Sequence, residues 1–227
     1  MRELIVNNYP KSSVTEAIKT VRTNLRFSSV GGKIKTVLIT SSISGEGKSF
    51  VSANLAATYA ASGEKVLLID CDLRRGRQQK LFGIVTSSKL GFSNLLIDDR
   101  WKKNLDEYIN ETEVENLNVL TTGTIPPNPT VLLESKKIEE VVEELKNKYD
   151  LIIFDTPPVA GLTDTLVLSR LADTVLIVAR SKKVTPETLS NTKESLAKVN
   201  ANIGGVILNG VDKLDSKYYK SYYYYTN

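Results

Sequence analysis

The sequence lacks histidine altogether, has one cysteine, and has no uninterrupted run of about 18 apolar residues that could span a membrane. Without imidazole, Ser-His-Asp and Cys-His mechanisms are excluded, so acid-base chemistry near neutral pH falls to carboxylates, lysine, tyrosine or bound water. Cys71 alone can form no intrachain disulfide, and metal sites that need several Cys or His are excluded as well. A reducing cytoplasm is therefore the expected location.

The chain also lacks the features of secretion and of nucleic-acid binding. Its start, MRELIVNNYP, does not have the charged and then apolar profile of a signal peptide. Its 30 basic and 26 acidic residues give a net charge of +4, far from the strong bias of a dedicated nucleic-acid binder. We therefore expect no nucleic-acid partner, and a role at the membrane only through another protein.

Short β-branched runs alternate along the chain with longer amphipathic ones, a pattern typical of a mostly parallel sheet with helices on both faces. The predicted strands cover residues 36–40, 65–70, 118–122, 151–155, 174–179 and 204–209. The predicted helices cover residues 13–28, 48–62, 129–148, 161–171 and 185–200. Asn128 or Thr130 is expected to cap the third helix. At this length we predict one α/β domain, residues 1–212, followed by a flexible tail, residues 213–227.

The first predicted strand leads into a glycine-containing turn and then into GKS at the start of a helix, within TVLITSSISGEGKSFVSANLA. This arrangement cradles phosphate, because backbone N–H groups point inward and the helix N-terminus adds positive potential. Lys48 would reach the terminal phosphates, and Ser49 would place its hydroxyl on Mg²⁺. The P-loop pattern has glycine where this chain has Ser42, which is a departure. The residues expected to bind the nucleotide are Ser44, Gly45, Glu46, Gly47, Lys48, Ser49 and Phe50.

Two further predicted strands end in acidic residues. If the strand continues through Cys71, Asp70 and Asp72 project to one face, where one could hold a metal ion while the other handles a proton. Asp155 ends LIIFD, the usual position of an acid that holds Mg²⁺ through water. Cys71 is interpreted as a small filler residue on the opposite face of the strand. Since ligands bind outside the carboxyl ends of such strands, one site is expected to join Lys48, Ser49, Asp70, Asp72 and Asp155.

Several segments resemble those of one family, in the same order. They are EAIKTVRTN near the start, SISGEGKS, LLIDCDLR, TTGTIPPNPTVLLES, IIFDTPP and the tyrosine-rich end YYKSYYYYTN. Together they look like the bacterial tyrosine kinases, the P-loop kinases of capsule and exopolysaccharide synthesis. The resemblance spans nearly the whole chain, and it implies an α/β fold of the P-loop NTPase type.

The resemblance implies a protein-tyrosine kinase that uses ATP and Mg²⁺. It implies that Lys48, Asp70 and Asp72 are catalytic, with the two acids acting in metal binding and in activating the tyrosine hydroxyl. It also implies that Arg74 lies near the phosphates. The implied metal ligands are Ser49, Asp72 and Asp155. Which of Asp70 and Asp72 takes the proton stays open at the level of sequence.

The last ten residues hold six of the ten tyrosines of the chain. A tyrosine hydroxyl titrates near pH 10, so it attacks phosphorus poorly unless a carboxylate and Mg²⁺-ATP position it and remove its proton. The tail is therefore interpreted as the substrate of the kinase itself. An extended chain from Asp212 to Tyr222 reaches about 33 Å, enough to enter a neighbouring subunit, and the rings of the family favour transfer in trans. The expected phosphorylation sites are Tyr218, Tyr219, Tyr222, Tyr223, Tyr224 and Tyr225.

The resemblance also implies partners. The expected activator is the cytoplasmic tail of a transmembrane regulator of polysaccharide chain length, which would recruit the kinase to the inner face of the cell membrane. A ring-shaped homo-oligomer and a cognate phosphotyrosine phosphatase are expected too, with a role in regulating the synthesis and export of capsular polysaccharide or exopolysaccharide. The family's N-terminal helix often carries E-x-x-R-x-x-R for ring assembly. Here Glu16, Lys19 and Arg22 give E-x-x-K-x-x-R, and lysine cannot reproduce the bidentate fork of arginine.

Two other classes of protein compete with this interpretation. An ATPase of the partition or cell-division positioning type shares the P-loop architecture, but it typically has an additional lysine early in the loop, where SSISGEGKS has only Lys48. A nucleotide-bound scaffold without catalysis is the other alternative. The full set of acids argues against it, because pure binding does not need them all.

Overall fold

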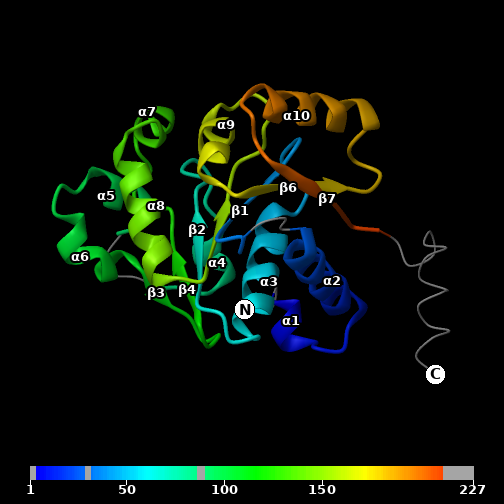
Figure 1. Ribbon diagram of the computed structural model, residues 1–227, viewed down its shortest axis with the longest axis horizontal. Coiled ribbons are helices and arrows are strands. Elements are labelled where there is room, and N and C mark those ends of the chain that lie inside the picture. The colour runs from blue at the N-terminus through cyan, green and yellow to red at the C-terminus, as the bar shows by residue number, and fades with distance from the viewer. Residues whose placement is uncertain (1–3, 29–31, 86–89, 212–227) are drawn as a thin grey trace.

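In the residues described by this computed structural model, 4–28, 32–85 and 90–211, seven strands form one sheet (Figure 1). Their order across the sheet is β3-β4-β2-β5-β1-β6-β7. Neighbouring strands run parallel, except that β3 is antiparallel to β4. The strands are β1 (Thr36–Ser41), β2 (Val66–Asp70), β3 (Asn110–Glu111), β4 (Leu117–Leu120), β5 (Leu151–Asp155), β6 (Thr174–Arg180) and β7 (Ile203–Asn209).

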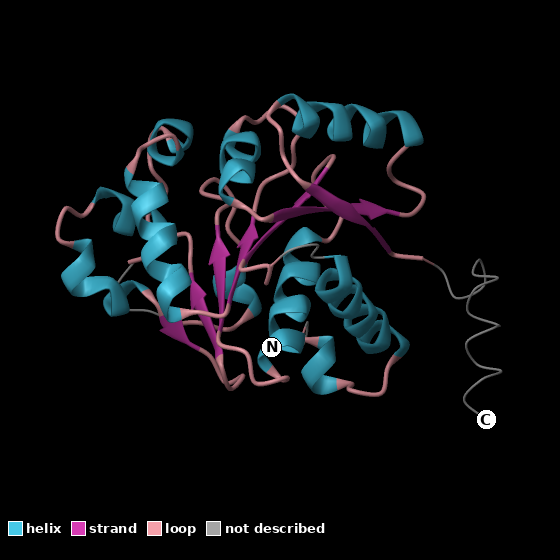
Figure 2. Cartoon of the chain, in the orientation of Figure 1, coloured by secondary structure: helices cyan, strands magenta, loops and turns pink. Residues whose placement is uncertain are grey.

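Helices cover both faces of this sheet, so the predicted fold class is confirmed (Figure 2). On one face, the second of two core clusters takes residues from α2 (Ser13–Ser28), α3 (Lys48–Ala60) and α4 (Gln78–Leu81), and Val6 of α1 (Ile5–Asn8) packs against it. On the other face, the larger cluster takes residues from α5 (Phe92–Ile97), α6 (Trp101–Tyr108), α7 (Pro129–Leu133), α8 (Lys137–Lys148), α9 (Asp164–Leu168) and α10 (Pro186–Lys198).

The central strands are mostly apolar because both of their faces are covered. Every residue of β1, β2 and β5 is buried. Successive side chains of a strand point to opposite faces. In β2, accordingly, Leu67 and Ile69 enter one core cluster while Val66 and Leu68 enter the other. All six predicted strands are confirmed within one or two residues at each end, whereas β3, with 2 residues, gave no pattern to detect.

The long helix predicted over residues 129–148 is wrong, because the chain forms two helices there, α7 and α8. Leu133 and Ile138 both enter the larger core cluster. In one continuous helix, positions five apart point about 140° away from each other. The turn between the helices, where Ser135 Oγ donates to the Leu132 carbonyl at 2.8 Å, lets both side chains reach the core. Asn128 occupies the N-cap position of α7 without a side-chain cap, and Thr130 lies inside that helix.

The helix predicted over residues 161–171 begins later, at Asp164, and ends in the 3₁₀ turn Ser169–Leu171. Gly161 has φ of 76°, the left-handed region that ends or interrupts a helix, so it cannot start this one. The short helices α1, α4, α5 and α6 were not predicted. They have between 4 and 8 residues, too few for apolar periodicity to stand out.

The helix α2 has the predicted bounds, but the residues proposed for ring assembly differ in their contacts. Lys19 and Glu16 form an exposed ion pair at 2.8 Å. Arg22 turns toward α3 instead, where its Nη1 donates to the Thr58 carbonyl at 3.3 Å and its guanidinium lies 5.9 Å from the centre of the Tyr59 ring. The predicted tail, residues 213–227 with its six tyrosines, lies outside the described residues.

Candidate active site

The loop after β1 enters α3 through two glycines in the left-handed region. Gly45 has φ of 79° and Gly47 has φ of 93°, a region that other residues rarely adopt. A side chain on Gly47 would also collide with the side-chain amide of Asn209. Lys48 is the first residue of α3, as predicted. Burial lowers the pKa of Lys48, and the nearby carboxylates of Asp155 and Asp72 oppose that shift.

The phosphate loop is braced by buried hydrogen bonds that the sequence analysis did not predict. The carboxylate of Glu46 is completely buried and accepts the N–H groups of Ile43 at 2.8 Å and Arg180 at 3.0 Å. Asn209 Nδ2 donates to the carbonyl of Glu46 at 2.8 Å. The side chain of Glu46, placed among the nucleotide-binding residues from sequence, therefore faces the protein interior and braces the loop.

Ser42, the departure from the P-loop pattern, has a structural role. Its hydroxyl is buried and lies 2.9 Å from the hydroxyl of Thr192, which comes from α10. Thr192 is in turn anchored to the Thr188 carbonyl at 2.9 Å. Glycine would lack this hydroxyl, so the serine fastens the start of the loop to α10.

Two acids end adjacent strands and lie beside each other. Asp70 of β2 pairs in register with Asp155 of β5, and both are buried. Burial, together with the charge of Asp155, raises the pKa of Asp70 to about 7. Burial likewise raises the pKa of Asp155, against hydrogen bonds from Gln78, Ser49 and Ser52 that lower it.

The expectation that β2 continues through Cys71 is wrong, because the strand ends at Asp70. The carboxylate of Asp70 draws the following chain around itself: its Oδ2 accepts the N–H groups of Arg77 at 2.7 Å and Gln78 at 2.9 Å. Asp70 and Asp72 consequently do not share one strand face. Cys71 is fully buried in the larger core cluster, and burial raises the pKa of its thiol, which agrees with its interpretation as filler.

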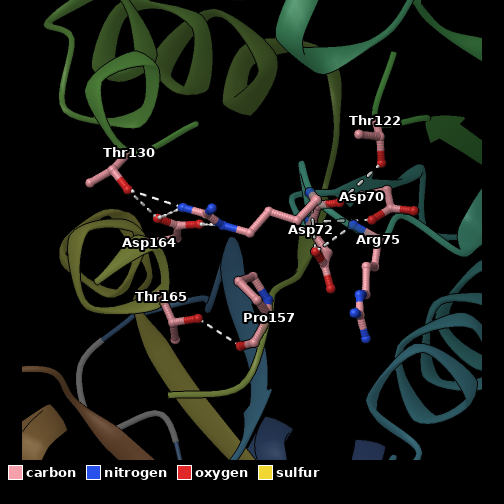
Figure 3. Close-up of polar contacts among 9 residues, drawn as sticks. Asp70, Asp72, Arg75, Thr122, Thr130, Pro157, Asp164 and Thr165 are labelled. Carbon is pink, nitrogen blue, oxygen red and sulfur yellow. Dashed lines mark hydrogen bonds and ion pairs between the residues drawn. The ribbon is translucent and has the colours of Figure 1, made fainter. Parts of the chain in front are cut away.

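Asp72, by contrast, faces an open cavity of about 850 Å³. Its Oδ1 accepts the N–H groups of Arg75 at 2.9 Å and Arg74 at 3.3 Å, so the turn holds the side chain in place (Figure 3). Neither Asp70 nor Asp155 lines this cavity. The predicted residues that line it are Ser44, Gly45, Gly47, Lys48, Ser49, Phe50, Asp72 and Arg74.

Arg74 has a partner that the sequence did not predict. Its Nε donates to Asp164 Oδ2 at 3.0 Å, and its Nη2 lies 3.4 Å from the hydroxyl of Thr130. Thr130 also donates to Asp164 Oδ1 at 2.6 Å (Figure 3). This triad of Arg74, Thr130 and Asp164 joins the turn that carries Asp72 to α7 and α9. The sequence analysis did not single out Asp164.

Replacing Asp164 by asparagine is expected to lower the free energy of unfolding by about 1 to 3 kcal/mol, because Arg74 and Thr130 lose a buried charged acceptor. Urea unfolding measures this change. Glu143→Gln is the matched control, since it removes an ion pair with Lys146 in which the glutamate side chain is 71% exposed, and we expect a change within about 0.5 kcal/mol. Equal effects of the two substitutions would contradict the structural role of the triad.

The residues present fit a magnesium ion. Mg²⁺ in phosphoryl-transfer sites takes one or two carboxylates together with phosphate and water oxygens. Asp155 supplies a carboxylate beside Ser49, whose side chain is hydrogen-bonded to it. Buried Gln78 also contacts Asp155, and its Oε1 has no hydrogen-bond partner within the described chain. Among the residues described, no group of three or more acidic, Cys or His side chains could hold an ion by itself, so the remaining ligands would be phosphate and water oxygens.

Comparison with known proteins resolves the competing interpretations. A family model described as an AAA domain matches residues 34–206. The chain is 40% identical to the putative tyrosine-protein kinase CapB of Staphylococcus aureus, over 98% of this chain and 94% of that protein. This chain belongs to the bacterial tyrosine kinases. The kinase is also 39% identical to the tyrosine-protein kinase YwqD of Bacillus subtilis, over 99% of its own length and 92% of that relative.

A solved structure supports the same assignment. The kinase domain of the Escherichia coli tyrosine kinase ETK superposes with a TM-score of 0.86 at 36% identity, covering 95% of this chain and 83% of that one. The expected tyrosine-kinase activity and the expected P-loop fold are thus confirmed. No helix in the described part of the kinase is long and apolar enough to cross a membrane.

Proposed function

We propose that this kinase transfers the γ-phosphate of ATP to the tyrosines of its own C-terminal cluster, in trans, between neighbouring subunits. The observation that carries the proposal is the cavity of about 850 Å³ that brings Lys48, Ser49 and Asp72 together beside the phosphate loop. The proposed acceptors are Tyr218, Tyr219, Tyr222, Tyr223, Tyr224 and Tyr225.

The nucleotide is proposed to lie against the backbone amides of the loop from Ser44 to Ser49, with Lys48 on the terminal phosphates. Gly45 and Gly47 keep that backbone accessible because they carry no side chain. Arg74 lines the same cavity, which supports its proposed place near the phosphates. Ser49 and Asp155 are the proposed holders of Mg²⁺, and Asp72, which the resemblance also implies as a metal ligand, is proposed to take the tyrosine proton instead. When bound there, Mg²⁺ would neutralise part of the negative charge on the phosphate oxygens.

In the proposed transfer, the phenolic oxygen of an acceptor tyrosine attacks the γ-phosphorus. A new oxygen–phosphorus bond forms while the bond between the γ-phosphorus and the bridging oxygen breaks, and ADP leaves with that oxygen. The tyrosine proton passes to the carboxylate of Asp72. Asp72 suits this role because it faces the cavity, whereas Asp70 is 1% exposed and already accepts backbone N–H groups. Asp70 is therefore proposed to act by shaping the turn that presents Asp72.

Transfer in trans is favoured by the reach of the tail and by the expected ring. The last strand, β7, ends at Asn209, and about ten extended residues beyond Asp212 span roughly 33 Å. Glu16 and Lys19 of α2 are exposed and stay available to a neighbouring subunit, while Arg22 is committed to α3. We therefore propose a ring that relies on the exposed part of α2.

In the cell, the kinase is proposed to work at the inner face of the membrane without inserting into it. The proposed activator is the cytoplasmic tail of a transmembrane regulator of polysaccharide chain length, and a phosphotyrosine phosphatase would reverse the reaction. The proposed output is control of capsular polysaccharide or exopolysaccharide synthesis and export. Similarity to the kinase CapB over nearly the whole chain supports this assignment.

The proposal is tested by peptide mass spectrometry of the purified kinase after incubation with Mg²⁺-ATP, beside a chain that ends at Asp215. We expect phosphate on tyrosines 218–225 of the full chain and none on the shortened one. Phosphate spread over tyrosines of the folded domain, or ATP hydrolysis without any phosphotyrosine, would contradict the assignment of the tail as substrate.

A further inference from the structure

Gln78 is fully buried between two parts of the proposed magnesium site. Its Nε2 donates to Asp155 Oδ2 at 2.7 Å and to the carbonyl of Ser49 at 3.1 Å. A carbonyl oxygen can only accept, so the amide nitrogen, and not the amide oxygen, must face Ser49. The side chain therefore ties the end of β5 to the first turn of α3.

The amide oxygen of Gln78 is left without a partner. Its Oε1 is buried and accepts no hydrogen bond from the described residues. Buried polar atoms in proteins are nearly always paired, with protein groups or with ordered water. Because the oxygen and nitrogen of one amide share a carbon atom, Oε1 lies within about 5 Å of Asp155 Oδ2. An unpaired acceptor so close to a proposed metal ligand needs a donor, and water bound to a cation is a strong one.

The backbone fixes where this side chain can reach. Gln78 opens α4, and its N–H donates to Asp70 Oδ2 at 2.9 Å. Asp70 thus holds the main chain of Gln78, and the side chain of Gln78 in turn holds Asp155. Ser52 Oγ contacts the other oxygen of Asp155, Oδ1, at 3.2 Å. The two oxygens of the carboxylate are therefore oriented by different donors.

We propose that Gln78 is a positioning residue of the magnesium site. Its NH₂ group orients the Asp155 carboxylate and the first turn of α3, and its Oε1 accepts a hydrogen bond from a water molecule of the magnesium shell. The inference rests on the magnesium site of the proposed function. Groups that orient metal ligands in this way typically contribute 10-fold to 100-fold to metal affinity.

The test compares Gln78→Met with wild type in the binding of a fluorescent ADP analogue, once with Mg²⁺ and once with EDTA. Mg²⁺ is expected to tighten binding to the wild type. In Gln78→Met we expect that gain to shrink about 10-fold to 100-fold, with metal-free affinity unchanged. The Mg²⁺ concentration for half-maximal phosphorylation should rise by a similar factor, while the rate at saturating Mg²⁺ recovers. If the substitution only damaged the structure, the phosphorylation rate would stay low at saturating Mg²⁺.

The neighbouring residue offers a matched control, because Gln79 is exposed on the same short helix. Gln79→Met is expected to keep the full gain from Mg²⁺. Equal losses with and without Mg²⁺ in Gln78→Met, or no loss at all, would overturn the inference about Gln78 alone. Absence of any gain in the wild type would instead overturn the magnesium site itself. Should Gln78→Met fail to fold, Gln78→Asn keeps a polar group too short to reach Asp155, and a full Mg²⁺ gain in that variant would equally overturn the inference.

Discussion

Replacing Lys48 by methionine is expected to lower the rate of tyrosine phosphorylation by about 10²-fold to 10³-fold or more, the usual cost of removing a group that stabilises charge in the transition state. Lys48 lines the cavity at the start of α3, where its ammonium group would meet the terminal phosphates. Methionine has a side chain of similar length without the charge. Phosphotyrosine formed over time from Mg²⁺-ATP measures the effect.

Unfolding of the protein would not explain a loss of phosphorylation activity in Lys48→Met. Burial lowers the pKa of Lys48, which means that the folded state disfavours the charged form and that Lys48 costs stability rather than adding to it. Lys48→Met should therefore unfold at the same temperature as wild type or at a higher one. Lys193→Met, at an exposed position of α10, is the control and should keep full activity. Near-normal phosphorylation by Lys48→Met would contradict the proposed site.

The second large effect separates the two acids of the segment LIDCDL. Asp72→Asn is expected to reduce phosphate transfer by about 10²-fold to 10⁴-fold, the contribution of a general base, while stability stays near that of wild type. Asparagine keeps an oxygen that can accept the N–H groups of Arg74 and Arg75, as Asp72 Oδ1 does. Binding of the ADP analogue without Mg²⁺ should also persist.

Asp70→Ala is expected to damage both stability and activity. The N–H groups of Arg77 and Gln78 lose their acceptor, and leaving buried donors unpaired costs about 1 to 3 kcal/mol. Urea unfolding and phosphorylation rates, measured on Asp70→Ala, Asp70→Asn and Asp72→Asn, distinguish the roles of the two acids. If Asp72→Asn kept its activity while Asp70→Asn lost it without loss of stability, Asp70 would be the base and the assignment would be reversed.

The sequence predicted the scaffold of the site well, since the same physical rule applies along each central strand. A strand covered on both faces is mostly apolar, so TVLIT, VLLID and LIIFD were recognisable, and their parallel order brings Lys48, Asp70 and Asp155 to one edge. The phosphate loop was recognisable because Gly45, Gly47 and Lys48 have a local geometric function. In each case the signal lies within a few consecutive residues.

The missed features depend on contacts between distant residues. Asp164 and Thr130 meet Arg74 only because α7 and α9 lie beside the turn after β2, and no local pattern marks such a meeting. Gln78 was missed for the same reason, because the contact that gives it a role is with Asp155, 77 positions away. The end of β2 at Asp70 was missed for a related reason, since the carboxylate of Asp70 bends the following chain back onto itself through the N–H groups of Arg77 and Gln78.

The most direct test of transfer between subunits mixes two chains, neither of which can phosphorylate its own tail. One lacks the activity and the other lacks the tail. One is isotope-labelled Lys48→Met with its complete tyrosine cluster, and the other is an unlabelled active chain that ends at Asp215. After incubation with Mg²⁺-ATP, peptide mass spectrometry reads the labelled tail. We expect phosphate on labelled tyrosines 218–225. If wild type alone gains phosphate there but the labelled tail in the mixture does not, the subunits do not phosphorylate one another and the account is contradicted.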